Sequence, residues 1–294
     1  MSDMNPLAFS TVACPDWDID RVIAAAKEYG YEGVELRTFG AGSSRLASDP
    51  ALSDAGKVRA KFEAGGVTIA CLATSLALHY KRKSEAEQAL ESGKSYIDLA
   101  AALGCERVRC FGYQIYPGEP WPTGVRRIAE RYQRLAEHAE DAGVEVLIEN
   151  AGSFARGKEL WQLTNYTDHP LVGVCWNVAY AASVGEGPGV SVTTLNSRIR
   201  YAKVKDTIVG EGSGFTPLGE GTVEVERFVE LLRGIGYDDW ICFEWDKAWL
   251  PSLEDPETAL PKARETLDEW MRLKVDKKGK PLSKWEAPAL EVKA

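Results

Sequence analysis

Four short apolar stretches in the second half of the chain each end in a polar side chain suited to proton or ion chemistry. These side chains are Glu149, Asn177, Lys203 and Glu244. A pair of carboxylates can exchange a proton with a carbon atom next to a carbonyl group. An ammonium group can stabilise the oxygen on which negative charge then develops. The four residue types therefore point to proton transfer, provided that the fold brings them to one place.

Short strands could bring these residues together. Side chains alternate between the two faces of a strand. In residues 144–150, Val144, Val146 and Ile148 therefore share one face, and Glu145, Leu147 and Glu149 share the other. A parallel barrel suits such strands, because helices cover its outside while the lumen ends in a polar mouth. The same alternation predicts eight polar lumen residues: Glu35, Arg37, Arg109, Glu149, Asn177, Lys203, Lys205 and Glu244.

Burial of this set has an energetic consequence. A buried polar group without a partner costs about 1–3 kcal/mol or more, so these groups must satisfy one another, a ligand or water. One alternative is an inert, salt-bridged lumen in which Lys203 neutralises Glu149 and Glu244 and nothing reacts. Arg109 is interpreted as a structural counter-ion deep in the barrel.

The whole chain alternates short apolar stretches with longer amphipathic ones, which is typical of repeated βα units. The predicted strands are 7–13, 33–37, 67–73, 107–111, 144–150, 172–177, 199–206 and 240–245. The predicted helices are 18–29, 53–64, 84–103, 124–142, 157–165, 192–197, 223–235 and 256–273. The sequence thus predicts an α/β protein, a single (β/α)8 TIM barrel over residues 1–273. Residues 274–294 form a charged C-terminal extension, expected to be an arm on the barrel or on a partner subunit, or else disordered.

Composition limits the possible partners. The chain has 294 residues and a net charge of -9, which argues against unaided binding to nucleic acid or to an acidic membrane. Its six cysteines lack CxxC spacing and are expected to be reduced core thiols. No segment reads as a signal peptide or as a membrane span of about 20 apolar residues. A cytoplasmic protein is expected.

Several motifs resemble one known family. They are Leu147-Ile148-Glu149, Val172-Gly173-Val174-Cys175-Trp176, Val204-Lys205-Asp206, Pro217-Leu218-Gly219-Glu220-Gly221 and residues 244–249. The chain resembles the xylose-isomerase-like TIM-barrel sugar (phosphate) isomerases and epimerases over nearly its whole length. The resemblance implies that strands five to eight supply Glu, Asp, His and Glu to one divalent ion, usually Mn²⁺ or Mg²⁺. It also implies that the two glutamates, here Glu149 and Glu244, are the acid/base pair.

The chain departs from the family at the other two ligand positions. Asn177 stands at the Asp position and Lys203 at the His position. An amide is a weaker ligand for hard cations than a carboxylate, and an ammonium has no lone pair to donate. We therefore expect no metal cofactor, with Lys203 as the replacement cation. A retained ion would be held by Glu149, Asn177 and Glu244.

Three functions remain open at this point. The first is a metal-independent isomerase or epimerase of keto-sugars, with Glu149, Glu244 and Lys203 as catalytic residues. The expected substrate-binding residues are Asn177, Lys205, Glu35, His79 and Trp249. The second is Schiff-base or lyase chemistry at Lys203, which requires a depressed lysine pKa. The third is a non-catalytic sugar-binding homologue or partner subunit. A homo-oligomer formed through the C-terminal arm is a further possibility.

Overall fold

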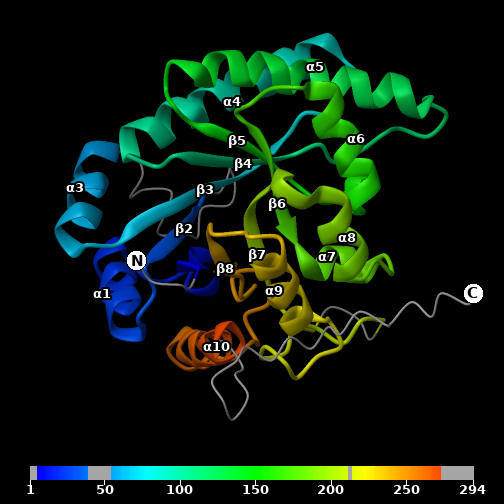
Figure 1. Ribbon diagram of the computed structural model, residues 1–294. Helices are drawn as coiled ribbons and strands as arrows, with labels where there is room; N and C mark the ends of the chain where they lie inside the picture. The colour runs from blue at the N-terminus through cyan, green and yellow to red at the C-terminus, as the bar shows by residue number, and fades with distance from the viewer. Residues whose placement is uncertain (1–4, 39–53, 211–213, 273–294) are drawn as a thin grey trace, which may run out of the picture.

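Eight parallel strands close into one barrel in the computed structural model, which describes residues 5–38, 54–210 and 214–272 (Figure 1). The strands are β1 (Leu7–Ser10), β2 (Gly33–Arg37), β3 (Thr68–Ala77), β4 (Arg107–Phe111), β5 (Glu145–Glu149), β6 (Val172–Asn177), β7 (Ile199–Val204) and β8 (Ile241–Phe243). Each strand pairs with the next, and β8 pairs with β1 through Leu7 and Ile241. The predicted (β/α)8 barrel is confirmed.

Helices surround this barrel in the order that the sequence predicts. They are α1 (Ile19–Tyr29), α3 (Ala55–Gly65), α4 (Lys83–Leu103), α5 (Trp121–Glu140), α6 (Gly157–Thr167), α7 (Val178–Ser183), α8 (Pro188–Leu195), α9 (Val225–Gly234) and α10 (Pro256–Met271). Local chemistry sets several ends. The Asp18 side chain accepts a hydrogen bond from the Arg21 amide at the start of α1, and Gly30 ends that helix with a φ of 79°.

Among the differences from the sequence prediction are three boundaries and one additional helix. β1 ends at Ser10, because a 3-10 turn (Thr11–Ala13) follows that the Ser10 side chain caps. β3 continues to Ala77, four residues beyond its predicted end. α5 begins at Trp121 rather than at residue 124, since Pro122 is compatible with a first helical turn. The short helix α7, which follows β6 directly, was not predicted.

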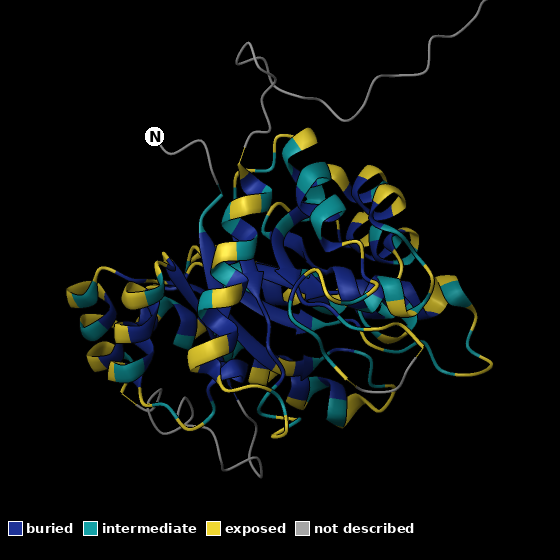
Figure 2. Cartoon of the chain, turned by 90° about the horizontal axis from the view of Figure 1, so that it is seen from below, coloured by how far each residue is buried: buried dark blue, intermediate teal, exposed yellow. Residues whose placement is uncertain are grey.

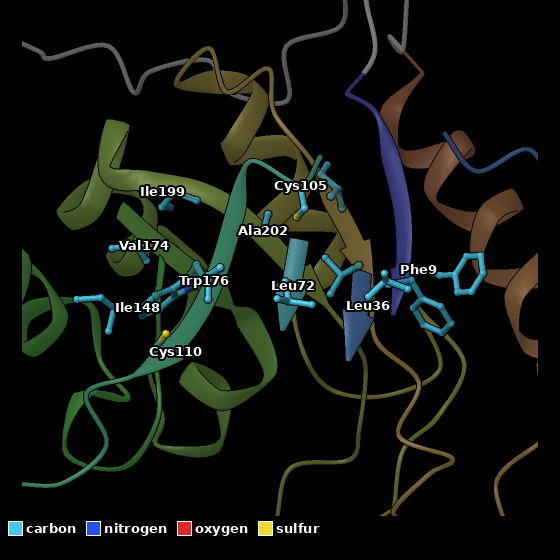
Figure 3. Packing of buried hydrophobic residues seen from close by; sticks show 14 of the residues in the cluster. Phe9, Leu36, Leu72, Cys105, Cys110, Ile148, Val174, Trp176, Ile199 and Ala202 are labelled. Atoms are coloured by element: carbon cyan, nitrogen blue, oxygen red, sulfur yellow. The ribbon is translucent and has the colours of Figure 1, made fainter. Parts of the chain in front are cut away.

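Strand side chains divide into two apolar layers. Those that face the helices, such as Leu36, Ile148 and Trp176, form the outer layer, as Figure 3 shows. The inner layer fills the lumen with Ala8, Ala70, Cys71, Leu147, Cys175, Tyr201, Trp240 and Cys242. This division confirms the predicted alternation of strands six to eight. All six cysteines are buried and free, as expected.

Exposure follows the same division. The strands are buried, while the outer faces of the surrounding helices are exposed (Figure 2). Over residues 5–38, 54–210 and 214–272, no helix is long and apolar enough to cross a membrane. The predicted C-terminal arm, residues 274–294, lies outside the described residues.

Candidate active site

Lys203 lies at the centre of a buried ion cluster at the C-terminal end of the barrel. Its Nζ atom is 3.1 Å from Glu35 Oε1 and 3.8 Å from Glu149 Oε2, and it makes a close ion pair with Glu244 Oε2. None of these four side chains is more than 6% exposed. The ammonium group therefore faces three carboxylates that come from β2, β5 and the end of β8.

Asn177 joins the two glutamates at the end of β6. Its Nδ2 atom donates to Glu149 Oε1 at 3.0 Å and to Glu244 Oε1 at 3.3 Å. The Asn150 side chain accepts from the Asn177 backbone N–H at 2.7 Å and donates to its carbonyl oxygen at 3.0 Å. Asn150 thus fixes the backbone from which the bridging amide projects. Asn177 Oδ1 is buried and accepts no hydrogen bond from the described residues.

Arg109, from β4, completes the inner part of the cluster. Its Nε atom lies 2.8 Å from Glu149 Oε2, and one of its terminal nitrogens donates to the Thr74 carbonyl oxygen at 2.5 Å. Its guanidinium carbon is 4.5 Å from the centre of the Phe111 ring. These contacts fit the role of a structural counter-ion for Glu149.

A second tier lies two residues further along strands seven and eight. Lys205 Nζ is 2.7 Å from Glu244 Oε1 and 2.7 Å from Asp246 Oδ2. The rings of Tyr180 and Phe215 lie 4.5 Å and 4.7 Å from the same ammonium. We call the ion-paired residues of both tiers the mouth network: Glu35, Arg109, Glu149, Lys203, Lys205, Glu244 and Asp246.

Sequence analysis missed Asp246. The signal was present, because Asp246 follows Glu244 by two residues and shares its face of the chain. The predicted strand ends at Trp245, one residue before Asp246. The structure shows why it continues: the Glu244 backbone N–H donates to the Val204 carbonyl oxygen at 3.0 Å, which extends the pairing past Phe243.

The charges of the network stabilise one another. Burial by itself would lower the pKa of Lys203, but the carboxylates of Glu149, Glu244 and Glu35 outweigh it and raise this pKa well above its usual value. Burial would likewise raise the pKa of Glu244, but the ammonium groups of Lys203 and Lys205 hold it well below its usual range. Burial and the charge of Glu244 raise the pKa of Asp246.

The buried charges assigned to the lumen at this end of the barrel also match in number. Four carboxylates, Glu35, Glu149, Glu244 and Asp246, face four cations, Arg37, Arg109, Lys203 and Lys205. Asp206 is also buried, but its carboxylate accepts hydrogen bonds from the backbone N–H groups of Gly219, Gly221 and Val223 in its own loop. The cations and carboxylates of the lumen are thus equal in formal charge.

This arrangement does not fit a divalent ion. Within the described part of the chain, no group of three or more His, Cys, Asp or Glu side chains could hold a metal. Lys203 contacts the same glutamates that a metal would need, and its ammonium has no lone pair to donate. Asn177 directs its N–H group, not its oxygen, at both glutamates. An added ion of charge +2 would also upset the equal numbers of charges.

His79 and Trp249 lie on loops at the same end of the barrel, after β3 and β8. The His79 ring stacks on Tyr80 at 4.5 Å and lies 5.2 Å from Tyr113. Burial, together with Arg127 and Arg131, lowers the pKa of His79. Trp249 is 51% exposed, and its ring centre is 6.0 Å from the Arg37 guanidinium carbon. Both residues are on the rim of the mouth, whereas Glu35, Asn177 and Lys205 lie inside it.

The sequence of this chain matches a protein-family model that has the fold described above. The model described as xylose isomerase-like TIM barrel matches residues 23–272, so the chain belongs to that family. Among curated relatives, the L-ribulose-5-phosphate 3-epimerase UlaE of Escherichia coli O17:K52:H18 (strain UMN026 / ExPEC) is 26% identical over 199 residues. That match covers 65% of this chain and 66% of the relative, so the chain spans just under two thirds of the length of this relative.

Two solved structures show the same fold. The IOLI protein, in a structure with a zinc atom, has a TM-score of 0.77 at 16% identity, covering 90% of this chain and 98% of that chain. The D-allulose 3-epimerase from Methylomonas sp., in complex with D-allulose, has a TM-score of 0.71 at 19% identity, covering 90% of this chain and 97% of that chain. At these identities the likeness establishes the shared fold alone.

Proposed function

We propose that the protein is a sugar isomerase or epimerase that moves a proton on the carbon next to the carbonyl group of a keto-sugar. The names of the epimerase relative and of the allulose-binding structure support this reaction class. One observation in this chain carries the proposal. Glu149 and Glu244 both place a carboxylate oxygen within 3.3 Å of a single nitrogen, Asn177 Nδ2, at the C-terminal end of the barrel. Catalytic groups of such barrels come from that end.

The first step uses a glutamate as the base. Glu244 is held ionised by Lys203 and Lys205, so it can accept a proton from the carbon. The electron pair of the broken C–H bond moves to the carbonyl oxygen and forms an enediolate. The protonated glutamate loses its charge while the oxygen gains one. The Lys203 N–H group that faced the Glu244 carboxylate can then bond to the negative oxygen of the enediolate. One negative charge next to the ammonium thus replaces another.

The second step returns the proton. If the same glutamate delivers it to the neighbouring carbon, while the hydroxyl proton of the original carbon passes to the former carbonyl oxygen, the sugar is isomerised. If Glu149 takes up a proton when the substrate binds and delivers it to the other face of the original carbon, the sugar is epimerised, and Glu244 releases its proton to solvent after turnover. In this scheme the donor groups of Asn177 and Lys205 orient the glutamates and sugar oxygens, and Glu35 keeps Lys203 charged. His79 and Trp249 contact the sugar from the rim.

No step in this scheme needs a metal ion, because Lys203 supplies the positive charge from within the chain. The family often uses a divalent cation, and the structure of the IOLI protein, which shares the fold, contains a zinc atom. Here the residue types at the ligand positions favour the ammonium.

The test is isotope exchange without metal. The protein is treated with EDTA and incubated in D₂O with L-ribulose, D-allulose and other keto-sugars, and the carbon-bound protons are followed by NMR while products are separated by chromatography. We expect a new sugar, or deuterium next to the carbonyl group, in at least one incubation. A complete absence of both, with every sugar and also after Mn²⁺ is added, would contradict the proposal.

A second candidate is a non-catalytic sugar-binding homologue or a partner subunit of an active enzyme. The observation that favours it is that Lys203 already faces three carboxylates, as expected for a purely structural ion cluster. Sugar-induced protection against thermal unfolding, together with no reaction in the isotope experiment, would favour this candidate.

Schiff-base or lyase chemistry at Lys203 has less support. A lysine reacts with a carbonyl group as the neutral amine, and the three carboxylates raise the pKa of Lys203. Borohydride treatment in the presence of a keto-sugar should therefore leave the mass of the protein unchanged.

A further inference from the structure

The carboxylates of the mouth network differ in how far they reach toward solvent. The exposed fraction of the side chain is 0% for Glu35, 1% for Glu149, 6% for Glu244 and 9% for Asp246. Asp246 is therefore the outermost of the four. A ligand that enters from the mouth meets its carboxylate before those of the two proposed catalytic glutamates.

These carboxylates also differ in how many of their oxygens are occupied. Glu149 has Asn177 on Oε1 and Arg109 on Oε2. Glu244 has Lys205 and Asn177 on Oε1, and Lys203 on Oε2.

Asp246 has only its Oδ2 atom engaged, by Lys205. Glu35 likewise has only Oε1 engaged, by Lys203, but the Oε2 atom of Glu35 is enclosed. Asp246 Oδ1 accepts no hydrogen bond from residues 5–38, 54–210 or 214–272, and it is not among their enclosed unsatisfied atoms. An acceptor is thus available at the outer edge of the network.

The surroundings hold this acceptor in a fixed position. The Asp246 backbone carbonyl accepts hydrogen bonds from the N–H groups of Trp249 and Leu250, both at 2.9 Å, which fixes the turn after β8. Lys205 anchors Oδ2, and its ammonium itself contacts the rings of Tyr180 and Phe215. A rigid carboxylate with one anchored oxygen and one accessible oxygen is suited to ligand recognition, because little ordering is needed on binding.

We propose that Asp246 is a substrate-binding residue whose Oδ1 atom accepts a hydrogen bond from a hydroxyl group of the sugar. This inference rests on the proposed function and adds a specificity to it. A carboxylate accepts and does not donate, so the sugar atom at this point must carry a proton. A hydroxyl group satisfies this condition, whereas a phosphate group placed against Asp246 would be repelled.

The substitution Asp246→Asn tests this with little change in shape. Lys205 needs an acceptor, so the single oxygen of the amide should take the place of Oδ2. The NH₂ group should then replace Oδ1 and present a donor where the sugar needs an acceptor. We expect the dissociation constants for L-ribulose and D-allulose, measured by calorimetry, to rise at least about tenfold for whichever sugar the unaltered protein binds.

Deoxy sugars separate recognition from a general structural effect. Each bound sugar is compared with forms that lack one hydroxyl group. For one of these forms, the unaltered protein and the Asp246→Asn variant should bind with equal affinity, because the contacted hydroxyl is missing. A tenfold loss that persists with every deoxy form would mean that Asp246 acts only on the structure, and would overturn the inference.

Asp239→Asn is the matched control. Asp239 lies just before β8, whereas Asp246 lies just after it. The Asp239 carboxylate accepts a hydrogen bond from Arg107 at 2.7 Å at the other end of the barrel. This variant should bind sugars as the unaltered protein does.

Affinity in Asp246→Asn within about twofold of the unaltered protein, with isotope exchange intact, would overturn the inference and leave the proposed function standing. Failure of the unaltered protein to bind any sugar would overturn both. Sugar binding that depends on Asp246 without isotope exchange would support the inference and contradict the proposed reaction.

Discussion

The two ends of the barrel both carry clusters of arginine or lysine with carboxylates, but in different surroundings. At the N-terminal end lies the floor cluster: Arg107, Glu145, Arg200 and Asp239. Its side chains are 14–32% exposed, whereas the ion-paired side chains of the mouth network are at most 9% exposed. The same kinds of residue are thus partly exposed at one end and buried at the other.

This difference indicates where function is to be sought. Partly exposed ion pairs contribute about 0–1 kcal/mol and are screened by salt. A buried ion network is costly to assemble and gains little for stability over an apolar core. Its presence at the end of the barrel where catalytic groups occur is therefore better explained by chemistry than by stability.

The largest contrast is expected for removal of one cation from each end. Lys203→Met leaves three buried carboxylates without their shared partner and should cost about 3–5 kcal/mol of unfolding free energy. Arg107→Met at the floor should cost about 1 kcal/mol, because water can replace the lost pairing. Urea denaturation followed by circular dichroism measures both. Equal losses in the two variants would remove the distinction between the ends.

Substitution of one glutamate at each end separates chemistry from structure. Glu149→Gln should lower the rate of sugar epimerisation by about 10²–10⁴-fold, since an amide cannot deliver the proton to the second face of the carbon. Glu145→Gln, only four residues away on the same strand, should leave the rate unchanged. Rates are compared by NMR at saturating sugar. Unaltered turnover in Glu149→Gln would assign the proton transfer to another residue.

Restoring Asp and His at positions 177 and 203 tests whether Lys203 takes the place of a metal ion. The double variant Asn177→Asp/Lys203→His should bind Mn²⁺ and gain about 2.7 kcal/mol of stability at an ion concentration 100 times its dissociation constant. The unaltered protein should show no gain, and elemental analysis after purification without chelator should find no stoichiometric ion. A stoichiometric metal in the unaltered protein would contradict the replacement of the ion by Lys203.

The smallest effect concerns pH. The depressed pKa of Glu244 contributes stability that is present above its unfolded value of about 4.3 and is lost as the pH falls through the folded value. The raised pKa of Lys203 contributes stability that is complete below its unfolded value of about 10.4 and is lost as the pH rises through the folded value. Between about pH 5 and 10 Glu244 and Lys203 should therefore add no pH dependence. Urea titrations of the unaltered protein at several pH values can show that both losses of stability begin outside this range.

The sequence contained most of the fold, because eight apolar stretches with two-residue alternation fix both the strands and the side chains inside them. Glu35, Glu149, Asn177, Lys203 and Glu244 could be assigned to the lumen for that reason. Alternation does not reveal where pairing ends, so the second tier at Asp246 was missed. The six-residue helix α7 was also missed, since a segment of that length has too few turns for a helical pattern.

Which atoms pair within the lumen could not be predicted. The bridging amide of Asn177 depends on its fixation by Asn150, a contact between neighbouring strands that are 27 residues apart in sequence. Strand parity brings both residues to the same end of the barrel, but rotamers and packing decide which oxygen meets which nitrogen. The unoccupied oxygen of Asp246 is a detail of the same kind.

The equal number of cations and carboxylates in the lumen makes its residues interdependent. Lys203→His alone would leave four carboxylates facing three fixed cations. Asn177→Asp alone would add a fifth carboxylate beside Glu149 and Glu244. Each single change leaves excess negative charge in a buried site, whereas the two changes together with a divalent ion would supply compensating positive charge.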